Sequence, residues 1–202
     1  MSGSTTSLLS PFPAANCGLV PDDAQCKAWW QEYDMLENIA VHSSLVAGIA
    51  TWIGHRATSR GIDLPLQALR AAGLLHDLAK TYTVRYGGNH SQLGGAWVMA
   101  LTGNPAIAQA VRHHVVWPGP LDVDAHFVPL VIIYADKRVK HDTIVPLPER
   151  YTDLFDRYGV SQKRVAAMRR SFVQVKNIES RLSNVLGVDL NAYSFDSRRM
   201  VQ

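Results

Sequence analysis

The sequence predicts an all-α protein, a single globular helical bundle of about seven to eight helices. Apolar residues recur at spacings of three and four in several segments, which is the period of an amphipathic helix. No alternation of polar and apolar residues is convincing as a β-strand. With 202 residues and 47% hydrophobic content, the chain can bury one sizeable core.

Three regions are expected along the chain. Residues 1–22 are rich in Ser, Thr, Pro and Gly and predict an irregular leader. Residues 23–186 predict the helical domain, with the functional motifs in 35–142 and C-terminal helices in 147–186. Residues 187–202 predict a mostly irregular tail.

Composition excludes several classes of protein. The formal charge is +3, and basic and acidic residues are interspersed. Because there is no block of basic residues, the sequence does not predict binding to duplex nucleic acid, but this charge is compatible with a small anionic substrate. Cys17 and Cys26 are too few for a disulfide scaffold, which favours a cytoplasmic setting. No uncharged apolar run reaches the ~18 residues of a membrane span, and residues 1–10 lack the pattern of a signal peptide.

The first two helices follow from a cap and an apolar stripe. Asp22 or Asp23 can cap a helix that runs to about residue 33. Residues 35–59 predict a second helix, whose stripe consists of Ile39, His42, Val46, Ile49 and Ile53. A histidine on such a stripe, taken alone, is more often a hydrogen-bonded core residue than a ligand.

The third helix is expected from about residue 64 to Lys80, and it is apolar almost all round. His76 and Asp77 follow the small residue Gly73, and Lys80 lies one turn beyond His76. Ionisable groups in a buried helix must be paired or bind a metal, because a lone buried charge is costly. The dipeptide alone is weak evidence, since a second copy, His141-Asp142, lies in a polar stretch typical of a loop.

The later segments alternate between helices and clear breaks. Residues 81–89, with a glycine pair, predict a loop that can bend over a cleft. A short helix over 90–101 is expected next, and Pro105 suits the first turn of the helix after it. Helices are also expected over 125–140, 147–158 and 161–186.

Asp136 lies in the C-terminal half of the predicted 125–140 helix. The dipole of a helix disfavours a carboxylate at that end. Asp136 is therefore expected to have a positive partner.

The ionisable residues on apolar helices form a candidate metal site. Their mixture of imidazoles and carboxylates suits Fe, Mn, Co, Ni or Zn and excludes a thiolate site. The set consists of His42, His76, Asp77, His90, His113 or His114, and Asp136.

This order of residues resembles the HD-domain metal-dependent phosphohydrolase superfamily, an all-α group named for the His-Asp pair. The resemblance covers about residues 35–142 and rests on His42, on His76-Asp77 and on Asp136. His90 and His114 look like the extra ligands of the subgroup that holds two metals.

The resemblance implies two divalent transition metal ions per chain. One set of ligands would be His42, His76, Asp77 and Asp136. The other would be Asp77, His90 and His114, so that Asp77 bridges the two ions.

The segment Val111-Arg112-His113-His114 looks like Ile-Arg-Tyr-His of this subgroup, which favours His114 as the ligand. His113 remains the alternative, because two consecutive helical residues do not point at the same ion.

The nearest resemblance is to the bacterial symmetrical diadenosine tetraphosphate hydrolases, although Val115 stands where they have a threonine. It implies hydrolysis of a phosphoester or phosphoanhydride of a nucleotide by metal-activated hydroxide, with diadenosine tetraphosphate as a candidate substrate. Asp77 and Lys80 would be the catalytic residues. The expected contacts with the phosphorylated substrate are Lys80, Arg85, Lys137 and Arg138.

Three alternatives stay open. The first is a regulatory HD module that binds a nucleotide without turnover, and the second is an HD hydrolase that acts on nucleoside monophosphates. The third is a lyase or oxygenase on the same metal frame. Lys80 has an alternative of its own, a lysine that favours the dipole at a helix end. The expected partner is a small phosphorylated molecule, with no membrane and no duplex nucleic acid, and a homodimer is left open.

Overall fold

The computed structural model describes residues 18–195, so most of the expected leader and the end of the expected tail lie outside the described residues. Within that part of the chain there are nine α-helices and one antiparallel pair of short strands, which confirms the all-α class. The elements are α1 Asp23–Glu32, α2 Glu37–Thr58, α3 Leu66–Leu75, α4 Lys80–Tyr86, α5 His90–Thr102, α6 Pro105–His113, α7 Phe127–Lys137, β1 Val139–Lys140, β2 Thr143–Ile144, α8 Leu147–Tyr158 and α9 Gln162–Leu186.

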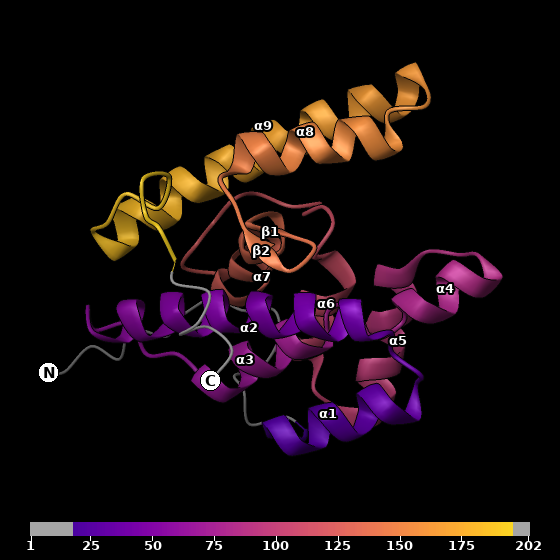
Figure 1. Ribbon diagram of the computed structural model, residues 1–202. Coiled ribbons are helices and arrows are strands. Elements are labelled where there is room, and N and C mark those ends of the chain that lie inside the picture. The colour runs from indigo at the N-terminus through magenta and orange to yellow at the C-terminus, as the bar shows by residue number, and fades with distance from the viewer. Residues whose placement is uncertain (1–17, 196–202) are drawn as a thin grey trace, which may run out of the picture.

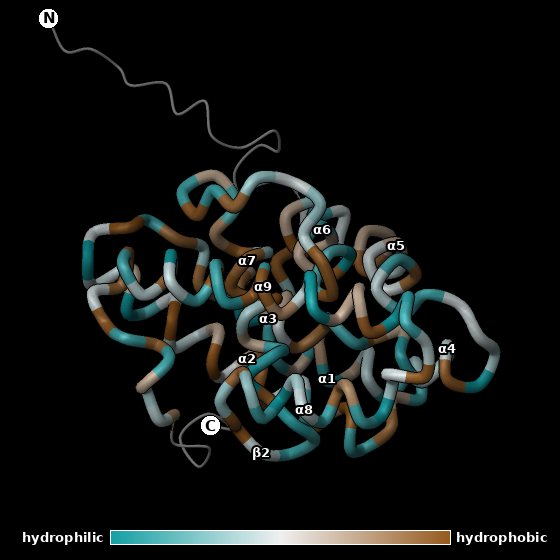
Figure 2. The backbone as a smooth tube through the Cα atoms, turned by 90° about the horizontal axis from the view of Figure 1, so that it is seen from above, coloured by the Kyte–Doolittle hydropathy of each residue, from teal (hydrophilic) through white to brown (hydrophobic). Residues whose placement is uncertain are grey.

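Helix α7 is the centre of the bundle, and all but one of its residues are buried. It packs against α2, α3 and α6 on one side and against α9 on another. In Figure 1 the paired helices α8 and α9 lie on one side of α7, and α2 and α3 lie on the other. Figure 2 shows the backbone of α7 as hydrophobic, whereas α8 on the outside is mostly hydrophilic. No helix in the described part of the chain is both long and apolar enough to cross a membrane.

Helices α2 and α3 approach each other closely because α3 has no side chain at Gly73. A Cβ atom at this position would lie 2.6 Å from the Cα atom of Ala47 in α2. The close approach brings the imidazoles of His42 and His76 together, with their ring centroids 5.4 Å apart. The apolar, small-residue segment seen in the sequence therefore positions two histidines from different helices.

The boundaries predicted for the third helix and for the loop after it were wrong. Helix α3 ends at Leu75, and residues 76–79 form a tight turn, with backbone hydrogen bonds from Leu78 N to Leu75 O and from Lys80 N to Asp77 O. Lys80 then begins α4 where a loop was expected. The turn is apolar because Leu78 and Ala79 are fully buried, so hydropathy alone does not separate it from the helix.

The expected helix over 125–140 is also shorter in the structure. Helix α7 ends at Lys137, and a β-hairpin follows in which Val139 pairs with Ile144. His141, in the turn of the hairpin, has a φ of 56°, in the left-handed region. A hairpin with two residues in each strand is too short to produce an alternating pattern, so the sequence did not indicate it.

Several helices begin at polar caps. The side chains of Asp22, Asn89 and Asn104 accept hydrogen bonds from backbone N–H groups in the first turns of α1, α5 and α6. After α9 the chain packs back on the bundle, where Leu190 and Phe195 are buried.

Replacing Gly73 by alanine should lower the free energy of unfolding by about 1–3 kcal/mol, because the new methyl group overlaps the backbone of Ala47. Gly54→Ala is the matched control in α2. Its methyl group would meet only the ends of two leucine side chains, at 2.7 and 2.8 Å, which can rotate away. Alanine also gains up to about 1 kcal/mol of helix propensity over glycine. Urea unfolding measures both variants, and equal losses would contradict the close backbone approach.

Candidate metal centre

Six ionisable side chains from five parts of the chain meet at one place beside α7. Five of them are buried, and His90 is half-buried. We call them the His/Asp cluster: His42 of α2, His76 and Asp77 of the turn after α3, His90 at the start of α5, His114 at the end of α6, and Asp136 of α7.

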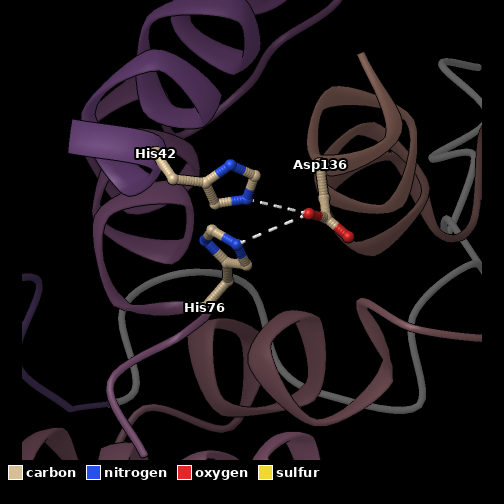
Figure 3. Close-up of side chains that lie close together, drawn as sticks. All are labelled: His42, His76 and Asp136. Atoms are coloured by element: carbon tan, nitrogen blue, oxygen red, sulfur yellow. Dashed lines mark hydrogen bonds and ion pairs between the residues drawn. The ribbon is translucent and has the colours of Figure 1, made fainter. Parts of the chain in front are cut away.

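His42, His76 and Asp136 form one part of the cluster, and Figure 3 shows the two imidazoles pointing at the same carboxylate. The Nε2 atom of His42 lies 3.0 Å from Oδ1 of Asp136, and the Nε2 atom of His76 lies 3.8 Å from it. One ligand atom from each of the three residues lies within 4.8 Å of the other two, which is close enough to hold one ion.

The carboxylate of Asp77 turns a different oxygen to each half of the cluster. Its Oδ2 atom lies 4.0 Å from His42 Nε2 and 3.5 Å from His76 Nε2. Its Oδ1 atom lies 3.4 Å from His90 Nε2 and 3.5 Å from His114 Nε2. A carboxylate placed in this way has the geometry to bridge two cations.

Hydrogen bonds to the backbone set the tautomers of two of the histidines. The Nδ1–H of His76 donates to the carbonyl of Gly73 at 2.8 Å, and the Nδ1–H of His114 donates to the carbonyl of Val111 at 2.7 Å. Since a neutral imidazole carries one N–H, the Nε2 atom of each ring keeps its lone pair. That lone pair is the one that a metal ion needs.

Two buried atoms of the cluster have no hydrogen-bond partner among the described residues. They are Nε2 of His76 and Oδ1 of Asp77. An unsatisfied buried acceptor costs about 1–3 kcal/mol, and a cation between these ligands would satisfy both atoms. The donor set therefore fits a divalent transition metal.

The carboxylates of the cluster are charged. Burial acts to raise the pKa of Asp77 and of Asp136, but Lys80 beside Asp77 and Lys137 beside Asp136 hold each pKa well below its usual range. The Nζ atom of Lys80 donates to Oδ2 of Asp77 at 2.7 Å, and Lys137 donates to Asp136. Asp136 thus has the positive partner that its place at the end of a helix requires.

Three of the imidazoles favour the neutral form, in which a histidine binds metal. Burial lowers the pKa of His42 and His114, and it lowers the pKa of His90 to about 4. His76 differs. Burial acts to lower its pKa, but the nearby carboxylates of Asp77 and Asp136 raise it overall, and the same negative field attracts a metal cation to Nε2.

Two of the expected substrate contacts lie elsewhere. Arg85 lies on a separate pocket of about 350 Å³ with Tyr82 and Tyr86, and its guanidinium is 3.4 Å from Asp34. Arg138 is buried, and it donates to the carbonyl oxygens of Val145 at 2.8 Å and Leu190 at 2.7 Å. Its guanidinium joins the end of α7 to the C-terminal segment. Neither arginine lines the cavity over the His/Asp cluster, so the substrate contacts expected of both stay predictions that this geometry does not favour.

The geometry also separates His113 from His114. The ring of His114 lies in the cluster, where its Nε2 atom is 3.1 Å from the Nε2 atom of His90. The ring of His113 is only partly buried and packs against Trp117, with the centroids 5.6 Å apart. Of the two, only His114 has the position of a ligand.

A cavity of about 900 Å³ opens over the His/Asp cluster. Lys80 and Lys137 line it, as expected of substrate contacts. Sequence reasoning missed the part of the lining that comes from the β-hairpin turn and from α8 and α9, which includes His141, Arg150, Tyr151, Arg157, Arg170, Ser171 and Gln174. No spacing in the sequence shows that the polar face of α8 turns toward the cluster, because an arginine-bearing face is usually solvated.

The chain has partial relatives among known proteins. The chain is 35% identical over 78 residues to Ribonuclease Y of Clostridium perfringens (strain 13 / Type A), an alignment that covers 39% of this chain and 14% of the relative. It is 36% identical over 78 residues to Ribonuclease Y of Aquifex aeolicus (strain VF5), covering 39% of this chain and 13% of that protein. The chain thus spans only a small part of the length of these curated relatives. No solved structure matches it significantly.

The family comparison covers more of the chain. The HD domain pattern matches residues 39–159. This range holds the whole His/Asp cluster, from His42 in α2 to Asp136 in α7. Since the match extends over more than half of the sequence, the chain belongs to the HD domain family.

Proposed function

We propose that this protein is a metal-dependent phosphohydrolase that hydrolyses a phosphoester or phosphoanhydride bond of a nucleotide. The observation that carries the proposal is the position of Asp77, whose two carboxylate oxygens face different pairs of histidines at the base of a cavity. Such a carboxylate would suit a site for two metal ions, because each of its oxygens could serve one ion.

The proposed ligands divide into two overlapping sets. His42, His76, Asp77 and Asp136 would hold the first ion. Asp77, His90 and His114 would hold the second. When bound, divalent cations lower the pKa of water and offset the negative charge of a phosphoryl group.

Lys80 and Lys137 supply positive charge next to the proposed ligands. Burial acts to lower the pKa of Lys80, but the Asp77 carboxylate raises it overall, so Lys80 stays protonated. Its ammonium group lines the cavity and can donate to a phosphate oxygen while it keeps its contact with Asp77. We assign Lys80 to the stabilisation of the negative charge on the phosphoryl oxygens in the transition state.

The proposed reaction is direct transfer of the phosphoryl group to water. An oxygen of water bonds to phosphorus, the bond to the leaving oxygen breaks, and that oxygen takes a proton. A covalent route is not favoured, since the hydroxyl of Ser171 in the cavity lies 2.7 Å from the hydroxyl of Tyr151 rather than beside a base. Burial raises the pKa of Tyr151, which keeps this phenol neutral.

A second candidate substrate class comes from the relatives. They carry the name Ribonuclease Y, which places RNA among the substrates to test. The completeness of the His/Asp cluster favours turnover over a regulatory module that only binds a nucleotide, because such a module has no use for the full ligand set.

Removing ligands should empty the two sites differently. Protein purified without chelators should contain more than one equivalent of transition metal by elemental analysis. Asp77→Ala should lower occupancy at both sites and abolish turnover, because both sets use this carboxylate, whereas His90→Ala should lose chiefly the second ion. Identical metal loss in the two variants would contradict the bridging role of Asp77.

Lys80→Met should leave the metal content intact and weaken transition-state stabilisation by about 2–4 kcal/mol, measured as kcat/KM. Lys27→Met is the control, since Lys27 is an exposed residue of α1 that does not line the cavity. If kcat/KM does not change in Lys80→Met, Lys80 serves only to neutralise Asp77.

A panel of substrates tests the class of reaction with Mn, Fe, Co or Ni supplied. It should contain diadenosine tetraphosphate, nucleoside monophosphates, guanosine polyphosphates, cyclic dinucleotides and a short RNA. Hydrolysis in ¹⁸O-labelled water should place one labelled oxygen in the phosphate product during a single turnover. Binding of a nucleotide without hydrolysis of any member would support the regulatory module instead.

A further inference from the structure

Positive side chains outnumber negative ones in the lining of the cavity. The lining carries five Lys and Arg side chains and two carboxylates. The two lysines pair with the carboxylates of the His/Asp cluster, Lys80 with Asp77 and Lys137 with Asp136. The remaining positive charge comes from α8 and α9.

We call this second group the arginine cluster: Arg150 and Arg157 of α8 and Arg170 of α9. In Figure 1 helices α8 and α9 lie on one side of α7, and α2, which bears His42, lies on the other. The arginine cluster therefore approaches the cavity from different elements than the proposed metal ligands do.

Arg150 is a nearly buried arginine whose hydrogen-bonding capacity is only partly used by the described residues. Its side chain is only 10% exposed. Its Nη1 atom donates to Oδ2 of Asp153 at 2.7 Å, but no described residue accepts a hydrogen bond from its buried Nε atom. The edge formed by Nε and Nη2 is the one that binds an oxyanion with two parallel hydrogen bonds. An unpaired guanidinium nitrogen is costly to bury. Arg150 also lines the cavity, so its guanidinium has hydrogen-bonding capacity left for an anion there.

The arginine cluster has few negative charges to balance it. Asp153 is shared, since Nη1 of Arg157 lies 3.7 Å and Nε2 of His141 lies 3.6 Å from its oxygens. Arg170 forms no ion pair within the described part of the chain. One carboxylate is therefore shared by two guanidinium groups and an imidazole, and the excess positive charge of the arginine cluster attracts anions into the cavity.

We propose that Arg150, Arg157 and Arg170 form a second phosphate-binding subsite, so that the cavity takes a nucleotide with several linked phosphates in preference to a monophosphate. The inference rests on the proposed function, which places the phosphate that reacts at the His/Asp cluster. A single phosphate can occupy only one of the two positions, whereas a phosphate chain can occupy both and gain the contacts of both.

Calorimetric binding of inorganic phosphates to the metal-loaded protein tests the subsite without any need for turnover. Tripolyphosphate and orthophosphate are titrated as magnesium complexes, with the same magnesium concentration in cell and syringe. Tripolyphosphate should bind the unaltered protein at least tenfold more tightly than orthophosphate. Arg170→Gln and Arg157→Gln should each weaken tripolyphosphate binding by about tenfold and change orthophosphate binding little, since a charge-assisted contact is lost at one position only.

The matched control is Arg169→Gln. Arg169 is the exposed neighbour of Arg170 on α9 and does not line the cavity. It removes the same charge from the same helix and should leave both affinities unchanged. Arg150→Gln should cause the largest loss of tripolyphosphate affinity. If this variant of a buried residue does not fold, the variants at the exposed positions 157 and 170 still test the proposal.

Several results would overturn the proposal. One is equal affinity of the unaltered protein for tripolyphosphate and orthophosphate. Another is an equal loss of tripolyphosphate affinity in Arg169→Gln and Arg170→Gln, which would indicate that only the overall electrostatic field of the protein attracts the anion. A short single-stranded RNA that binds through Arg170, without discrimination between the phosphates, would assign the arginines to a nucleic-acid strand. If the subsite binds tripolyphosphate as expected but the substrate panel gives no hydrolysis, the proposed function fails and the subsite stands.

Discussion

Asp77 and Asp136 place two carboxylates inside a bundle whose core is mostly apolar, and the surrounding arrangement follows from that constraint. Taking a charge out of water costs several kcal/mol unless opposite charges and hydrogen bonds compensate. Each carboxylate is compensated by its own lysine and by imidazoles from other helices. The helices α2, α5, α6 and α7 must therefore converge on one place, and their packing cannot be changed there without uncovering a buried charge.

The close packing of α2 on α3 prepares this convergence. Because Gly73 lets the backbones approach, His42 and His76 face each other across the helix interface. Helix α3 then ends, and Asp77 lies in a turn rather than within a helix. In this turn the carboxylate faces His42 and His76 with one oxygen and His90 and His114 with the other. The end of α3 is thus as important to the site as the histidines themselves.

Arginines of this chain serve two different physical purposes. Arg138 uses its guanidinium to bind backbone carbonyl oxygens near the C-terminal segment, and it is fully engaged within the fold. Arg150 is also nearly buried, but its Nε atom has no partner among the described residues. The distinction depends on what each guanidinium meets and not on its distance in sequence from the His-Asp pair. It separates a structural arginine from one that has capacity left for a ligand.

The sequence by itself determined the helical class and most helix boundaries, because hydrophobic spacing and polar caps such as Asn89 and Asn104 act over a few residues. It also supplied the six members of the cluster, since a family pattern preserves residue types in order. It could not locate the end of α3 at Leu75 or the helix that begins at Lys80, because the buried turn between them is as apolar as a helix. The tertiary structure decided that the ring of His114 points into the cluster, that Arg138 is buried and that Arg150 lines the cavity. Each depends on contacts between segments far apart in the chain, and local spacing carries no information about them.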